Sequence, residues 1–103
     1  MIEMSAQRAV TIEVRDNPRA SRFEAYVGDE QWGILTYERR RRRTEIIHTV
    51  TDPARRGQGV ASALAGAAFA DARARGSEVL IICPFVESWL DRHPEHADIV
   101  LDD

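Results

Sequence analysis

One segment of the chain reads Arg55-Arg56-Gly57-Gln58-Gly59-Val60-Ala61. It joins an apolar, strand-like run at residues 46–50 to an alanine-rich helical stretch at residues 62–75. Glycine lets the backbone turn tightly and approach a ligand, and the first amides of a helix point free N–H groups at an anion. No Asp or Glu lies between Gln58 and Gly66, so no carboxylate competes for that place. The segment predicts a phosphate-binding turn with pyrophosphate as its ligand; an ordinary glycine-rich turn between a strand and a helix is the alternative.

Two common nucleotide-binding patterns do not fit. The Walker pattern needs a Lys before a Ser or Thr, and the chain contains no Lys. A dinucleotide-binding fingerprint requires three glycines at fixed spacing and an acid about twenty residues on, after a further strand. Glu78 lies near that distance but precedes the next strand. The turn is therefore expected to hold a phosphate ligand of another kind.

The hydrophobic pattern on either side of the turn predicts one small α/β (α+β) domain. Alternation of period two and turn residues indicate four strands before the turn, at residues 10–14, 22–27, 32–38 and 44–50. After the long helix, residues 79–83 are typical of a short, buried parallel strand. Residues 85–92 predict a second helix, with Pro84 in its first turn and Pro94 beyond its end. The expected fold is an antiparallel meander followed by a strand–loop–helix–strand unit.

Length and composition narrow the class of protein. The chain has 103 residues, of which 44% are hydrophobic, which suits a single domain over residues 1–103. No apolar run approaches the length of a membrane span, and residues 1–8 lack a signal-like apolar stretch, so we expect a cytoplasmic protein. One cysteine excludes an intrachain disulfide. We expect no metal.

The glycine turn resembles the acetyl-CoA loop of the GNAT superfamily of N-acetyltransferases. That loop has Arg or Gln, two residues, Gly, one residue, then Gly or Ala, and here Arg56, Gly59 and Ala61 fill it. A further likeness to the short, single-domain YjdJ-like branch covers roughly residues 37–100. It rests on His48-Thr49, Asp52-Pro53, Cys83-Pro84-Phe85-Val86 and Arg92-His93-Pro94. The resemblance implies a single GNAT-like domain with an N-terminal antiparallel meander, a β-loop-α-β acetyl-CoA unit and a short C-terminal helix.

The same resemblance implies a function. The chain would bind acetyl-CoA as a cosubstrate and transfer the acetyl group to an unidentified amine. The pyrophosphate would be held by Arg56, Gly57, Gln58, Gly59, Val60 and Ala61, and pantetheine by the backbone of Val50. The chain departs from the family pattern because no Tyr follows Tyr37 and because Val50 stands where relatives often carry an acid. The alternative is a CoA-binding or acyl-sensing module with little turnover.

Two residues are candidates for catalysis. His48 could take the proton from the amine, since imidazole exchanges protons near neutrality. If side chains alternate strictly along this strand, His48 lies on the same face as Ile46 and Val50. The other interpretation is therefore a hydrogen-bonded histidine in the core. Cys83 would lie near the thioester by resemblance. It could carry the acetyl group as a thiolate nucleophile, with His48 or His93 as its activator, or be a small buried hydrophobe.

The arginine run at residues 39–43 suggests a nucleic-acid contact, because adjacent guanidinium groups can neutralise phosphates. The run begins a strand whose far end meets the glycine turn, roughly 20 Å away at about 3.3 Å per residue. It is better explained as a solvated hairpin turn balanced by Glu38 and Glu45. The net charge of -3 also argues against a general nucleic-acid surface. The sequence leaves the oligomeric state open between a monomer and a homodimer.

Overall fold

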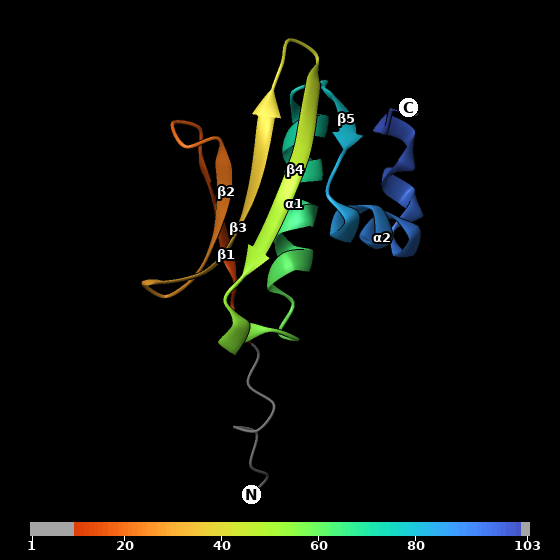
Figure 1. The fold of residues 1–103 in the computed structure, drawn as a ribbon. Coiled ribbons are helices and arrows are strands. Elements are labelled where there is room, and N and C mark those ends of the chain that lie inside the picture. The colour runs from red at the N-terminus through yellow and green to blue at the C-terminus, as the bar shows by residue number, and fades with distance from the viewer. Residues whose placement is uncertain (1–9, 102–103) are drawn as a thin grey trace, which may run out of the picture.

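The computed structural model describes residues 10–101, which form one five-stranded sheet covered on one face by helices (Figure 1). The strands follow one another across the sheet in the order β1-β2-β3-β4-β5. The first four strands pair antiparallel, and β4 pairs parallel with β5. The elements are β1 (Glu13–Asn17), β2 (Arg22–Val27), β3 (Glu30–Arg39), β4 (Arg43–Thr51), η2 (Pro53–Arg55), α1 (Val60–Ala74), β5 (Glu78–Ile81), α2 (Pro84–Arg92) and η3 (Pro94–Ile99). The predicted meander and the strand–loop–helix–strand unit are both confirmed.

The first and last strands are displaced from their predicted bounds, and β3 and β4 each extend one or two residues beyond theirs at both ends. The first strand was expected at residues 10–14 but runs from Glu13 to Asn17, because Asp16 and Asn17 pair with β2 before the chain turns. The last strand was expected to reach residue 83 but ends at Ile81. The amides of Ile82 and Cys83 both donate to the carbonyl of Ile46, at 2.8 and 3.1 Å, which ends the regular ladder.

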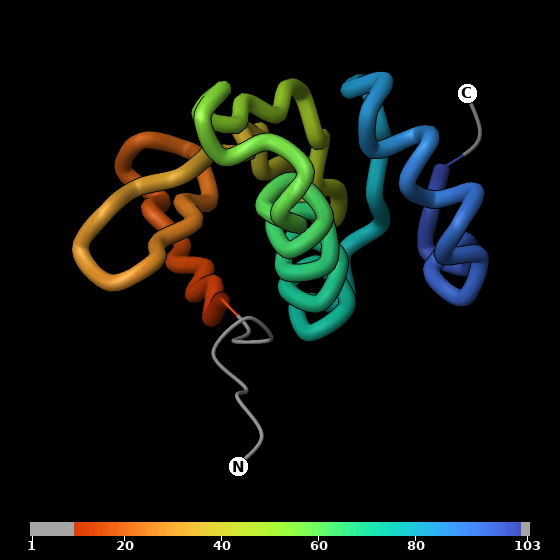
Figure 2. Tube along the Cα trace, turned by 90° about the horizontal axis from the view of Figure 1, so that it is seen from below, coloured from red at the N-terminus to blue at the C-terminus, as the bar shows by residue number. Residues whose placement is uncertain are grey.

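Helix α1 packs its alanine-rich side against the sheet and forms the centre of the core. Leu64, Ala65, Ala68, Phe69 and Ala72 are all fully buried, and small side chains let a helix lie close to a sheet. Helix α2 lies beside α1, as the view from below shows (Figure 2). The rings of Phe69 and Trp89 join the two helices with centroids 5.5 Å apart. Trp89 is 2% exposed and belongs to the core.

A β-bulge in β4 changes which side chains face the core. Tyr37 pairs with Ile46 and Thr36 with His48, so Ile47 is an extra residue in the ladder. Ile46 is fully buried, whereas Ile47 and His48 are both exposed. The expectation that His48 shares a face with Ile46 is therefore wrong, because the bulge interrupts the alternation between them.

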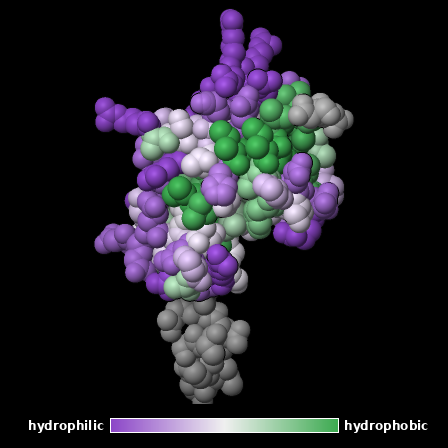
Figure 3. Space-filling view, in the orientation of Figure 1, coloured by the Kyte–Doolittle hydropathy of each residue, from purple (hydrophilic) through white to green (hydrophobic). Residues whose placement is uncertain are grey.

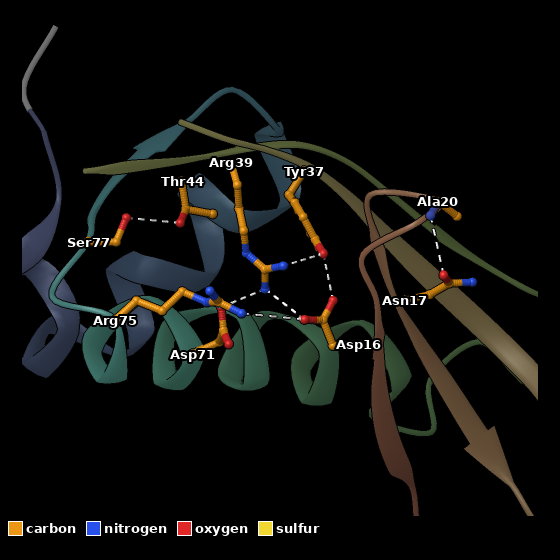
Figure 4. Close-up of polar contacts among 9 residues, drawn as sticks. All are labelled: Asp16, Asn17, Ala20, Tyr37, Arg39, Thr44, Asp71, Arg75 and Ser77. Atoms are coloured by element: carbon orange, nitrogen blue, oxygen red, sulfur yellow. Dashed lines mark hydrogen bonds and ion pairs between the residues drawn. The ribbon is translucent and has the colours of Figure 1, made fainter. Parts of the chain in front are cut away.

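A polar network joins α1 to the edge of the sheet that is formed by β1 (Figure 4). Arg39 donates to Tyr37 Oη at 2.8 Å and to carboxylates of Asp16 and Asp71 at 2.8 Å each. Tyr37 Oη lies 2.6 Å from Asp16, and burial together with this hydrogen bond raises the pKa of the Tyr37 hydroxyl. The network joins β1, β3 and the end of α1. Arg39, expected in the solvated turn, is instead a structural residue.

The rest of the arginine run behaves as predicted. Arg40 and Arg43 pair with Glu45 at 3.2 and 2.9 Å, and Arg41 and Arg42 are exposed at the hairpin tip. Within residues 10–101, no helix is long and apolar enough to cross a membrane.

Candidate functional site

A cleft opens where β4 and β5 separate. The last paired residues of the two strands are Ile46 and Ile81. Beyond them, β4 continues to Thr51, whereas the chain that follows β5 leads into α2. The cleft has a volume of about 670 Å³. It is lined by His48, Thr49, Val50, Thr51, Arg55, Arg56, Gly57, Gly59, Val60, Ala61, Ser62, Phe85 and Arg92. The structure thus brings together most of the residues that the sequence singled out; Gln58 and Cys83 do not line the cleft.

The glycine turn forms one end of this cleft. Gly57 and Gly59 have φ angles of 80° and 87°, a left-handed conformation that other residues rarely adopt. A Cβ added at either position would meet no heavy atom within 4 Å, so both glycines face open space. Gly59 is the N-cap of α1 and supplies no side-chain cap, and Ala63 donates the first helical hydrogen bond to Gly59. The amides before Ala63 are therefore available to an anion.

The charged side chains that line the cleft are all positive. The lining contains Arg55, Arg56 and Arg92 but no Asp or Glu. Arg55 stacks 4.3 Å from the Trp32 ring and donates to Glu30 at 2.9 Å, while its buried Nε has no partner among the described residues. Free helix amides, arginines and an unpaired buried donor fit a pyrophosphate group.

Gly33 on β3 fixes how closely the cleft walls approach each other. A Cβ at this position would lie 2.8 Å from the carbonyl oxygen of Val50 and 2.8 Å from Val60 Cγ1. The end of β4 and the start of α1 can therefore meet over Gly33 only because it has no side chain. This contact could not be predicted from local sequence patterns, since it joins three separate elements.

His48 lies in the middle of the cleft wall, three residues before the end of β4. The bulge at Ile47 turns it outward, so the imidazole is exposed to the cleft instead of being buried in the core. From this position, the His48 side chain can reach a ligand that is bound along β4. The interpretation of His48 as a core histidine does not fit its exposure.

Cys83 lies at the separation of the strands but behind the cleft wall. It is 2% exposed, and its Sγ is 3.4 Å from Thr49 Oγ1. His93, suggested as an activator, stacks on Trp89 at 4.1 Å and its Nδ1 lies 2.9 Å from the Trp89 carbonyl oxygen. The thiol therefore has a hydroxyl neighbour, and the His93 ring is engaged with Trp89.

Phe85, Arg92 and Ser62 were not assigned to the site from the sequence. Phe85 and Arg92 are seven residues apart, which is two helical turns and places them on one side of α2. That spacing was a usable signal, but only the tertiary structure shows that this side faces β4. Within residues 10–101, no group of three or more His, Cys, Asp or Glu side chains is arranged to hold a metal ion.

Comparisons with known proteins agree with this architecture. Residues 22–99 match the family model described as GCN5-related N-acetyl-transferase. A GCN5-like candidate N-acetyltransferase from Staphylococcus aureus, solved by NMR, aligns with a TM-score of 0.68 and 23% identity over 88% of this chain and 89% of that one. Ard1 from Thermoplasma volcanium aligns with a TM-score of 0.52 and 24% identity over 57% of this chain and 41% of that one. No curated protein sequence matches the chain.

At these identities the two structures establish a shared fold. The family match spans β2 to η3 and so includes the cleft and its glycine turn. The chain therefore belongs to the GCN5-related N-acetyltransferase family.

Proposed function

We propose that the chain binds acetyl-CoA and transfers its acetyl group to an amine. The observation that carries the proposal is the left-handed turn at Gly57 and Gly59, which leaves the first amides of α1 free at the arginine-lined, acid-free end of the cleft. A pyrophosphate there would be bound by the residues from Arg56 to Ala61. Family membership makes the pyrophosphate of CoA the natural candidate.

The part of β4 that follows Ile46 is suited to binding pantetheine. Beyond Ile46 the strand has no β5 partner within the described residues, so its outward backbone groups are free to bond an extended, amide-containing chain. Val50 lies in this part of the cleft wall and is 45% exposed. We assign its backbone to pantetheine, which directs the thioester from the glycine turn toward His48.

The proposed chemistry is direct attack by the amine. The amine nitrogen forms a bond to the thioester carbonyl carbon, the C–S bond breaks, and the CoA thiolate leaves with the electron pair. His48 accepts the proton that the amine loses on becoming an amide. The alternative route through an acetylated Cys83 requires the sulfur to reach the thioester. Its burial behind Thr49 favours the direct route.

A binding module with little turnover is the second candidate. It is favoured by the cleft lining, which has no tyrosine to protonate the departing thiolate; Tyr26 and Tyr37 lie in β2 and β3, outside the cleft. The hydroxyl groups of Thr49, Thr51 and Ser62 are the remaining O–H donors in the lining.

Release of free CoA thiol from acetyl-CoA in the presence of mixed amines distinguishes the two functions. A transferase releases thiol in proportion to enzyme and forms the N-acetyl product, detectable by mass spectrometry. Saturable acetyl-CoA binding without amine-dependent thiol release would overturn transfer and leave the binding module. Absence of binding would overturn both.

A further inference from the structure

Two adjacent arginines precede the glycine turn, and only one of them is held by neighbouring side chains. Arg55 is half-buried and contacts β3, whereas Arg56 is exposed and has no ion pair or aromatic contact within residues 10–101. Both line the cleft. Figure 3 shows that the lower part of the front face, where Figure 1 places η2 and the glycine turn, is mainly hydrophilic, while hydrophobic side chains gather higher up over β4 and β5. The two arginines therefore belong to the polar end of the cleft.

Two residues at the start of β3 hold the Arg55 guanidinium in place. Its Cζ lies 4.3 Å from the centroid of the Trp32 ring, which keeps the guanidinium over the indole. Its Nη2 donates a 2.9 Å hydrogen bond to Glu30 Oε1, which limits rotation there. The indole Nε1 of Trp32 donates to the same Glu30 oxygen at 3.0 Å, so the carboxylate is itself anchored. We call Glu30 and Trp32 the Arg55 clamp.

The backbone ties the clamp to the segment that carries Arg55. The Asp52 amide donates to the Trp32 carbonyl at 2.8 Å, and the Asp52 carbonyl accepts from the Arg55 amide at 2.8 Å. The Asp52 side chain also accepts from the Ala54 amide at 3.0 Å, which caps η2. Trp32 is 6% exposed and part of the core. The position of Arg55 is therefore built into the fold.

The clamp leaves most of the Arg55 donors unused. A guanidinium carries five N–H donors, and the bond to Glu30 comes from Nη2. The buried Nε has no partner, and no hydrogen bond from Nη1 reaches another residue in the described part of the chain. A buried donor without an acceptor costs free energy, and a phosphate oxygen is a strong acceptor for arginine. Arg55 is thus ready to bind a second anion.

We propose that Arg55, and not Arg56, is the main side-chain ligand of the CoA pyrophosphate, with Glu30 and Trp32 as its positioning residues. The inference rests on the proposed binding of acetyl-CoA and departs from the assignment to Arg56 that the resemblance implies. A side chain that is already ordered in the fold loses little freedom when a ligand binds. Arg56 would have to be ordered by the ligand itself, while its backbone takes part in the turn.

Glu30 gives the proposal a distinctive sign. A carboxylate near the site repels pyrophosphate, so removal of its charge alone should strengthen binding. If Glu30 positions Arg55, removal of the whole side chain should instead weaken binding. A glutamine keeps an oxygen acceptor for both Arg55 and Trp32 and should restore the affinity.

The first test is calorimetry of the protein with acetyl-CoA. Arg55→Gln should raise the Kd by about tenfold or more, the loss expected for hydrogen bonds to a charged group. Arg56→Gln should raise it by a smaller factor. The Arg55→Gln factor should be the same with acetyl-dephospho-CoA, which keeps the pyrophosphate but lacks the phosphate on the ribose.

The second test is a double-mutant cycle. Glu30→Ala should raise the acetyl-CoA Kd by about threefold or more, the effect of releasing one side chain, and Glu30→Gln should reverse most of that loss. In the Arg55→Gln background, Glu30→Ala should cause no further loss, because the two residues act through one contact. A role of Glu30 in stability alone would leave the two losses additive.

The chain offers a matched control outside the cleft. Arg15 lies 4.2 Å from the Tyr26 ring centroid and donates to Glu13 at 3.1 Å, which repeats the contacts of Arg55 in β1 and β2. Neither Arg15 nor Glu13 lines the cleft. Arg15→Gln and Glu13→Ala should therefore leave the acetyl-CoA Kd unchanged.

The outcomes separate this inference from the proposed function. Wild-type binding of acetyl-CoA with an equal or larger effect of Arg56→Gln, or with tighter binding by Glu30→Ala, overturns the inference alone. A loss in Arg55→Gln that disappears with acetyl-dephospho-CoA overturns the assignment to the pyrophosphate. Failure of the wild type to bind acetyl-CoA overturns the proposed function from its first step.

Discussion

Trp89 on α2 donates a 2.9 Å hydrogen bond from its indole Nε1 to Ser62 Oγ in the first turn of α1. Ser62 lines the cleft, and Trp89 is buried against α1, where its ring stacks on Phe69. Together with the packing of Trp89 on Phe69, this hydrogen bond helps to fix the position of α2 relative to the glycine turn.

Ser62→Ala should destabilise the protein, because it leaves the buried indole N–H without a partner. The expected loss in unfolding free energy is about 1–3 kcal/mol, measured by urea denaturation. Ser62→Thr keeps the hydroxyl and serves as the control, with a smaller loss. An unchanged denaturation midpoint in Ser62→Ala would show that the hydrogen bond does not hold α2 in place.

Gly59→Glu should abolish acetyl-CoA binding by placing a carboxylate where the pyrophosphate is proposed to bind. Gly59→Gln is the matched control, since it has the same size and the same backbone strain at φ 87°, a cost of about 1–2 kcal/mol in either variant. Calorimetry should give a Kd for the Glu variant more than about tenfold above that for Gln, reflecting the charge. Equal affinities would contradict the assignment of the turn to the pyrophosphate.

His48→Ala should lower kcat by about 10²-fold, the usual contribution of a general base. The side chain is exposed, so the fold and the acetyl-CoA Kd should both be retained. Steady-state kinetics across pH, together with calorimetry, measure the two effects. A kcat within twofold of wild type would remove His48 from the mechanism.

Cys83→Ala should retain transfer if the amine attacks the thioester directly. A loss of stability of about 1 kcal/mol is expected from the buried site, without a change in acetyl-CoA affinity. Intact-mass spectrometry of the wild type mixed with acetyl-CoA alone provides a second test. Loss of transfer in the variant, together with an acetyl group trapped on Cys83 in the wild type, would establish the two-step route.

Acid should weaken the fold partly through Glu24, which is 7% exposed. Hydrogen bonds from Asn17 and then from Arg22 hold the pKa of this carboxyl below its ordinary value of 4.5. A carboxyl with a lowered folded-state pKa binds fewer protons folded than unfolded. Its stabilisation is therefore complete above pH 4.5 and is lost as the pH falls through the folded-state pKa.

Glu24→Gln removes this charge and should cost about 1–3 kcal/mol at pH 7, as expected for hydrogen bonds to an ionised group. The difference from wild type in urea denaturation should shrink below pH 4.5. A difference that stays constant from pH 7 into the acid range would contradict the role of the ionised carboxylate.

Local patterns in the sequence predicted the elements well. The alanine-rich stretch after the glycine turn forms α1, and residues 85–92 lie within α2, because caps, prolines and apolar spacing act over a few residues. The glycine turn itself was also found locally, since Gly57 and Gly59 carry the left-handed conformation that such a turn requires.

Features that depend on pairing between distant residues were not predictable. The bulge at Ile47 arises from the register of β4 against β3, and it moves His48 from the predicted core face into the cleft. The contact of Gly33 with Val50 and Val60 joins three elements, and none of them signals it alone. The narrower likeness to the YjdJ-like branch stays a prediction.

The most direct test of the central claim is a calorimetric titration of the purified protein with acetyl-CoA, beside acetyl-pantetheine, which lacks the pyrophosphate and the nucleotide. Saturable binding of acetyl-CoA, with acetyl-pantetheine weaker by about 10²-fold or more, is the predicted result for helix amides and arginines that hold the pyrophosphate. Equal affinity for the two ligands, or no saturation with acetyl-CoA at millimolar concentration, would contradict it.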